Sequence, residues 1–98
     1  MDQVWIVLAG VIAFTEAAPE VAQPGFVNVV CAGADRKAVE TKVRDHLLSY
    51  GWRILQIESS SPVDDDAAYD DELWGLIEDV RQNGELILLA TLHSYRVN

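Results

Sequence analysis

A dense group of acidic side chains between positions 64 and 72 is the part of the sequence best suited to chemistry. Six carboxylates fall within these nine positions, and aromatic residues stand at positions 69 and 74. Clustered carboxylates speed association with a positively charged surface, and Tyr and Trp often anchor protein interfaces. The group predicts a partner-binding surface formed by Asp64, Asp65, Asp66, Tyr69, Asp70, Asp71, Glu72 and Trp74.

Two other interpretations of this acidic group compete with partner binding. Acids in the first turn of a helix interact favourably with the helix macrodipole, so the group also fits a solvated helix start. In that case Tyr69 and Trp74 pack against the protein's own core. A calcium loop is disfavoured, because Asp64 and Asp66 are followed by Ala68 and lack the glycine that such a loop needs. We therefore expect no metal site.

The sequence also holds one cysteine and two histidines, the residue types of nucleophile and base pairs. Cys31 falls in an apolar β-like segment, where a thiol usually behaves as a small inert hydrophobic group. His46 and His93 fall in a helical and a β-like segment, and their spacing does not bring them to Cys31. A Gly-rich phosphate loop and the GxSxG, HExxH and CxxC motifs are missing. We expect no enzymatic activity and no cofactor.

Four segments have the apolar, β-branched pattern of strands. Val4–Phe14 is almost continuously apolar, which is typical of a central strand or of one covered on both faces. Phe26–Ala34 and Trp52–Ser59 alternate, and Leu86–Tyr95 has an apolar core. The segment Thr15–Gly25 contains two prolines and a final glycine, so we expect a loop there.

Two further segments have helical periodicity. Asp35 is a suitable N-cap for the first helix, and Gly51 can supply the left-handed residue that ends it. The apolar stripe of this helix is formed by Val39, Val43, Leu47 and Tyr50. The second helix is predicted from about Tyr69 to Gln82, with Gly75 inside it at a cost of roughly 1 kcal/mol relative to alanine.

The element order ββαβαβ predicts a small α+β or α/β domain covering residues 1–98. A strand–helix–strand unit normally joins parallel strands by a right-handed crossover. We therefore expect a mixed four-stranded sheet with two helices on one face. This two-layer sandwich resembles the ferredoxin-like architecture or a related split type, which hosts many unrelated functions.

Such a two-layer sandwich leaves one face of its sheet without helices. The apolar side chains of the strands, Trp5, Phe26 and Trp52 among them, cannot all point toward the helices. The loop expected at Thr15–Gly25 or a second copy of the chain must then cover the other face. A homodimer is the second of these alternatives.

Composition excludes several classes of partner. The net charge of −9 disfavours direct binding to nucleic acid and to anionic membranes, because both depend on Lys and Arg. Residues 64–98 carry nine acids and two arginines, so most of the excess charge lies there. The apolar run Val4–Phe14 is shorter than the about 20 residues of a membrane span and lacks a basic segment before it. We therefore expect a cytoplasmic location.

These observations predict a small acidic protein-binding module that occludes a basic protein partner through an acidic helix start. An inhibitor, an immunity protein against a toxin or an antitoxin fits this description. The alternative is a homodimeric small-molecule-binding or housekeeping protein of the ferredoxin-like type. The acidic helix start supports the first hypothesis, and the apolar sheet face supports the second.

Overall fold

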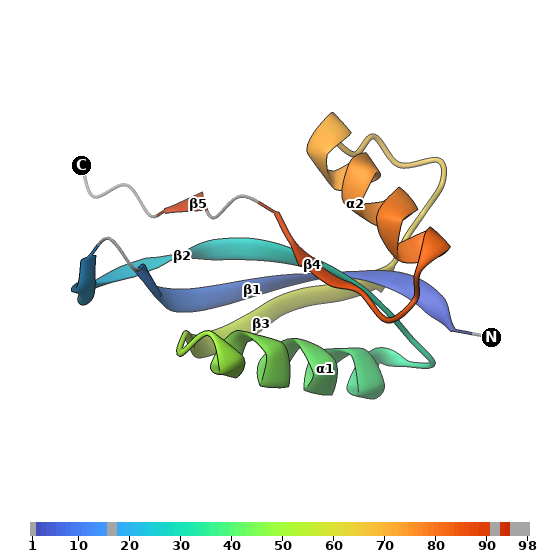
Figure 1. Ribbon diagram of the computed structural model, residues 1–98. Helices are drawn as coiled ribbons and strands as arrows, with labels where there is room; N and C mark the ends of the chain where they lie inside the picture. The colour runs from blue at the N-terminus through green and yellow to red at the C-terminus, as the bar shows by residue number, and fades with distance from the viewer. Residues whose placement is uncertain (1, 16–17, 91–92, 95–98) are drawn as a thin grey trace.

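The computed structural model describes residues 2–15, 18–90 and 93–94. Its antiparallel sheet has the strand order β3-β1-β2-β4, and β5 also pairs with β2 (Figure 1). The elements are β1 (Gln3–Thr15), β2 (Ala18–Gly33), α1 (Arg36–Ser49), β3 (Arg53–Pro62), α2 (Asp71–Gln82), β4 (Ile87–Leu89) and β5 (His93–Ser94). The predicted order ββαβαβ is confirmed, with β5 as an added short strand. Within the described residues, no helix is long and apolar enough to cross a membrane.

β1 and β2 form one long antiparallel hairpin. Trp5 lies opposite Cys31, and the same register continues to Ile12 opposite Pro24. The prediction of a loop at Thr15–Gly25 is wrong, because β2 already begins at Ala18. Pairing with β1 outweighs the local turn preference of proline and glycine in this segment. Residues 18–25 thus extend the sheet and do not fold over one of its faces.

All paired strands of the sheet are antiparallel, so the expected mixed sheet is wrong. The crossover through α1 does join two strands that run in the same direction, β2 and β3. However, β1 lies between them and pairs antiparallel with both. The prediction failed because it assumed that strands joined by a helix are neighbours in the sheet.

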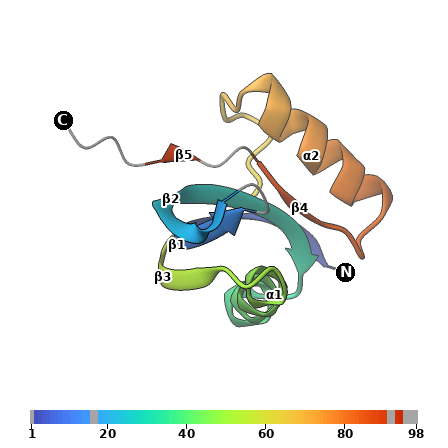
Figure 2. The same cartoon turned by 60° about the vertical axis from the view of Figure 1, so that its left-hand side comes forward.

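The two helices lie on opposite faces of the sheet (Figures 1 and 2). Trp5 and Val7 of β1 pack in the cluster that contains the buried residues of α1, whereas Ile6 packs with Ile77 and Val80 of α2. The prediction of both helices on one face is therefore wrong. The alternating faces of β1 need a cover on each side, and one helix supplies each cover.

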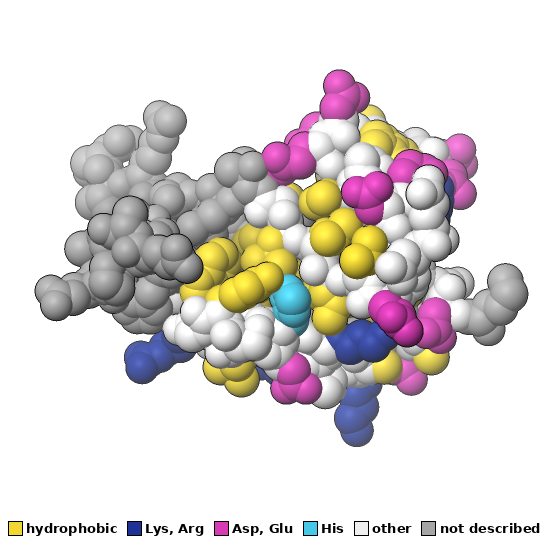
Figure 3. All heavy atoms as spheres, in the orientation of Figure 1, with side chains coloured by type: hydrophobic (Ala, Val, Ile, Leu, Met, Phe, Trp, Pro, Cys, Tyr) yellow, Lys and Arg dark blue, Asp and Glu magenta, His cyan; other side chains and the backbone are white. Residues whose placement is uncertain are grey.

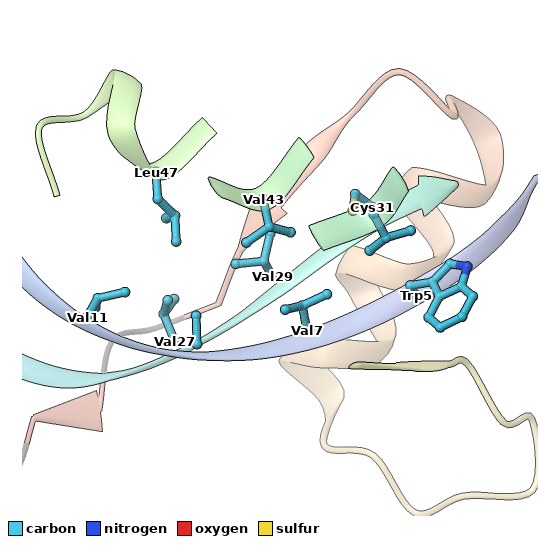
Figure 4. Close-up of a cluster of buried hydrophobic side chains, with 10 residues drawn as sticks. Trp5, Val7, Val11, Val27, Val29, Cys31, Val43 and Leu47 are labelled. Carbon is cyan, nitrogen blue, oxygen red and sulfur yellow. The ribbon is translucent and has the colours of Figure 1, made fainter. Parts of the chain in front are cut away.

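The core under α1 consists mainly of small branched side chains (Figure 4). Val43 and Leu47 of α1 point toward Val27 and Val29 of β2, and all four are fully buried. At the end of this cluster, the indole Nε1 of Trp5 donates a hydrogen bond of 3.2 Å to the Gly33 carbonyl oxygen. The packing of α1 on the hairpin therefore involves β-branched residues with few alternative rotamers.

The ends of α1 are those expected from the sequence. The Asp35 carboxylate accepts a hydrogen bond of 2.8 Å from the backbone N–H of Ala38, which confirms the N-cap. Gly51 has φ of 76°, a left-handed conformation that other residues rarely adopt. It lies in the turn that leads from α1 into β3.

Ser60 attaches the first half of α1 to β3. Its hydroxyl group is buried and donates a hydrogen bond of 2.6 Å to the Glu40 carboxylate. The Arg36 guanidinium donates to the carbonyl oxygen of the same serine at 3.2 Å. These contacts direct Glu40 toward the sheet and fix the rotation of α1, which decides which of its side chains face solvent.

Candidate functional site

The acidic segment leads into α2 through a tight turn that uses two of its own carboxylates. Asp64 Oδ1 accepts the backbone N–H of Asp66 at 2.9 Å, and the Asp64 carbonyl accepts the N–H of Ala67 at 3.1 Å. Asp70 is the N-cap of α2, since its Oδ1 accepts the N–H of Leu73 at 2.8 Å. Asp64 and Asp70 therefore shape the backbone, as the interpretation as a helix start predicts.

Asp65 is neutralised by an arginine from the other end of α2. Its Oδ1 lies 2.5 Å from a guanidinium nitrogen of Arg81, which also binds Glu78 at 3.0 Å. The hydrogen bond to Asp65 raises the pKa of Arg81 above its already high ordinary value. An exposed ion pair of this kind contributes little to stability, but it compensates the negative charge of Asp65.

Tyr69 and Trp74 lie together beside the core of α2. Their ring centroids are 5.0 Å apart in an edge-to-face arrangement, and both rings pack against the cluster of Ile77 and Val80. The Tyr69 hydroxyl also accepts the backbone N–H of Asp64 at 3.1 Å. Both aromatic residues are half-buried, so they stabilise the start of α2 and keep part of their surface open.

The outward face of α2 continues the acidic surface beyond the predicted residues. Asp71, Gly75, Glu78 and Asp79 are exposed and follow one another at helical spacing. Glu78 and Asp79 are absent from the prediction, although their distance from the apolar stripe places them on the solvent face. Residues 64–85 carry nine acids and one arginine, a net charge of −8. Figure 3 shows acidic side chains gathered over α2.

Cys31 makes no hydrogen bond with His46, the histidine whose side chain the structure describes. It is fully buried under α1, and this burial raises the pKa of its thiol, with Lys42 acting in the opposite direction. His46 is near the surface, where its Nε2 lies 3.2 Å from the Tyr50 hydroxyl. His93 pairs with Phe26 through the backbone of β5, and its side chain lies outside the described residues. The structure forms no nucleophile and base pair from Cys31 and His46.

Cys31 is expected to react much more slowly with a thiol reagent in the folded protein than in urea. The thiol ionises at about pH 8.5 in the unfolded chain and at higher pH in the folded one. Its contribution to the free energy of unfolding is therefore complete below that pH and is lost as pH rises through the raised pKa. Urea unfolding at several pH values, with Cys31→Ala as the non-titrating control, measures this loss. Equal reactivity in folded and unfolded protein would contradict the burial.

The hollow between the start of β1 and the end of α2 offers little to a small ligand. It is lined by residues that include Asp2, Lys42, Arg81 and Glu85. The Lys42 ammonium donates to the Ala32 carbonyl at 2.7 Å, and Arg81 is held by Asp65 and Glu78. Both cations in the hollow are therefore engaged within the protein.

The residues that the structure describes contain no group of three or more His, Cys, Asp or Glu arranged to hold a metal ion. Comparison of the chain with protein-family models, curated proteins and solved structures finds no match.

Proposed function

We propose that this protein binds a basic protein partner through the outward face of α2 and the turn before it. This acidic α2 surface comprises Asp64, Asp65, Asp66, Asp70, Asp71, Glu72, Glu78 and Asp79. The observation that carries the proposal is the net charge of −8 on residues 64–85, held on a capped helix. Ile77 and Val80 fix that helix to the sheet, so the carboxylates keep their positions.

The acidic residues divide into two roles under this proposal. Asp64 and Asp70 order the turn and the helix start, and Asp65 holds Arg81. Asp66, Asp71 and Asp79 are exposed and supply charge for steering a cationic surface during encounter. The open parts of Tyr69 and Trp74 then supply apolar contact area, since aromatic anchors beside charged rims are typical of protein interfaces.

A rigid surface of this kind suits an inhibitor, an immunity protein or an antitoxin, which acts by covering a basic site on its target. Electrostatic complementarity sets the rate and specificity of such encounters more than their final affinity. The alternative of a homodimeric small-molecule-binding protein depended on a sheet face without helices. Because α1 and α2 take opposite faces, that argument loses its main support.

Reversing two outward carboxylates, Asp66→Lys and Asp71→Lys, is expected to slow association with the partner about 10-fold or more at low salt. The reason is the loss of electrostatic steering, so the difference should shrink at high salt. Wild-type and variant proteins are used as baits to capture the partner from a lysate of cells whose genome encodes this protein. The retained partner is purified, and its association rate is measured at two salt concentrations.

The matched control reverses two exposed acids away from α2, Asp45→Lys and Glu58→Lys, which changes the net charge equally. This control is expected to keep the partner that the α2 variant loses. Circular dichroism checks the α2 variant, because a lysine in place of Asp71 in the first turn opposes the helix dipole by about 0.3–1 kcal/mol. The proposal would be contradicted if the α2 variant and the control retained the same partner. It would also be contradicted if the association rate did not depend on salt concentration.

A further inference from the structure

The surface on the other side of the sheet is apolar and basic. Leu48, Tyr50 and Leu55 are 61%, 54% and 51% exposed, the most open large hydrophobic residues among those whose side chains the structure describes. Leu48 lies in the last turn of α1 and Tyr50 is its C-cap, whereas Leu55 lies on β3. Tyr50 also contacts the half-buried Trp52, with ring centroids 6.0 Å apart. Exposed apolar residues gathered in this way are typical of an interaction surface.

Positive charge extends from this apolar end along the outer stripe of α1. Lys37, Thr41, Arg44 and Leu48 are all exposed and share one helical face. In the part of the chain that the structure describes, Arg81 is the one cation in close ion pairs, so neither Lys37 nor Arg44 forms one. We call Lys37, Arg44, Leu48 and Tyr50 the α1 surface.

Several acids border this stripe, and Glu40 lines a hollow together with Lys37 and Arg44. Asp35 caps the helix, and Glu40 accepts the buried Ser60 hydroxyl. Asp45, three residues before Leu48, is also exposed beside the stripe and lines a shallow hollow with Lys42 and His46. Glu58 on β3 accepts a hydrogen bond from Gln56. Residues 35–53 still carry a net charge of +2, within a protein whose net charge is −9.

We propose that the α1 surface binds the acidic α2 surface of a second copy of this chain. The charges complement each other, since residues 35–53 carry five bases and three acids while residues 64–85 have a net charge of −8. The exposed Leu48 and Tyr50 would meet the open parts of Tyr69 and Trp74 across the contact. Pairing of two α1 surfaces is disfavoured, because both carry the same excess of positive charge.

The position of the two surfaces decides the form of the assembly. Because α1 and α2 lie on opposite faces of the sheet, each copy offers one surface on either side (Figures 1 and 2). The contact is therefore head-to-tail, and it adds copies in a row unless the rotation between them closes a ring. Repulsion between chains of charge −9 opposes growth, and the contact weakens as salt screens the attraction.

This inference shares the α2 surface with the proposed function, and a basic partner would compete with the second copy for it. The two can still be separated, because the α1 surface takes part only in self-association. The base-reversed variant, Lys37→Glu and Arg44→Glu, should lose self-association and keep the purified basic partner. The acid-reversed variant, Asp71→Lys and Asp79→Lys, should lose both.

Sedimentation of the wild-type chain at low salt is expected to give an average mass that rises with concentration above 10.9 kDa. High salt should return it to the monomer. The base-reversed variant alone should associate at least about 100-fold more weakly, because like charges then face each other. The acid-reversed variant alone should also associate more weakly, because the net charge of its residues 64–85 falls from −8 to −4. In an equal mixture, the intact α2 surface of the base-reversed variant can bind the intact α1 surface of the acid-reversed variant. The mixture should form a dimer that does not grow further, since each copy retains one intact surface.

Leu48→Ser tests the apolar half of the contact without a change of charge, and we expect weaker self-association from this exposed position. A monomeric wild-type chain at low salt and high concentration would overturn the inference. So would a dimer of fixed size that neither charge-reversed variant affects, because such a dimer uses another surface. A mixture that stays monomeric would overturn the head-to-tail pairing.

Discussion

Replacing Gly33 with alanine is expected to destabilise the fold by about 1–3 kcal/mol, the usual cost of overpacking. A Cβ atom at this position would lie 2.4 Å from Cγ2 of Val39, a distance that real contacts essentially never show. Val39 is fully buried in α1, and its branched side chain has one strongly preferred rotamer in a helix. The helix must therefore shift away from β2. Urea unfolding of the single variant measures the loss.

Two further variants test the cause of this effect. Gly33→Ala should cost less in a Val39→Ala background, because the methyl group that it strikes is then gone. Gly75→Ala should have the opposite sign and stabilise by up to about 1 kcal/mol, since a Cβ there meets nothing within 4 Å. A neutral Gly33→Ala variant would mean that α1 does not approach β2 as closely as the structure shows.

Truncation of Leu47 to alanine is expected to have the largest effect on the α1 side, about 2–5 kcal/mol. Leu47 is fully buried, and it points from α1 into the cluster around Val11 and Val27 (Figure 4). The loss combines the transfer free energy of the side chain with the cavity left among stiff valine side chains, which relax little. Urea unfolding measures it, and a loss below about 1 kcal/mol would contradict this packing.

A second substitution turns the same measurement into a test of the architecture. Ile77→Val on α2 should cost about 0.5–1.5 kcal/mol. Because the sheet separates Leu47 from Ile77, the two losses should add within about 0.5 kcal/mol in the double variant. A much larger coupling would indicate that both helices share one core, as in the two-layer sandwich expected from the sequence.

Much of the local structure followed from the sequence. The Asp35 cap and the left-handed Gly51 were predicted and are present, because both depend on residues only a few positions away. The continuous apolar run from Val4 also indicated a strand covered on both faces, and that part of the prediction is confirmed. Followed further, this run would have argued for one helix on each face of the sheet, because a single layer of helices covers only every second residue.

The candidate site was predicted in composition but only in part in geometry. Tyr69 and Trp74 pack together beside α2, and Asp70 caps that helix, all consistent with the local pattern. The pairing of Asp65 with Arg81 joins residues sixteen positions apart, and no periodicity in the sequence indicates it. The outward acids Glu78 and Asp79 lie beyond the run of aspartates, and only helical spacing relates them to Asp71.

The amino-acid sequence by itself determined the order of strands and helices, where the helix caps lie and on which third of the chain the negative charge gathers. These properties depend on neighbours within one or two turns, so periodicity and side-chain chemistry report them. Only the tertiary structure decided that β1 separates β2 from β3, that β2 reaches back to Ala18, and that α1 and α2 take opposite faces. Those outcomes depend on pairing and packing between distant segments, and the same local patterns are compatible with several paths of the chain.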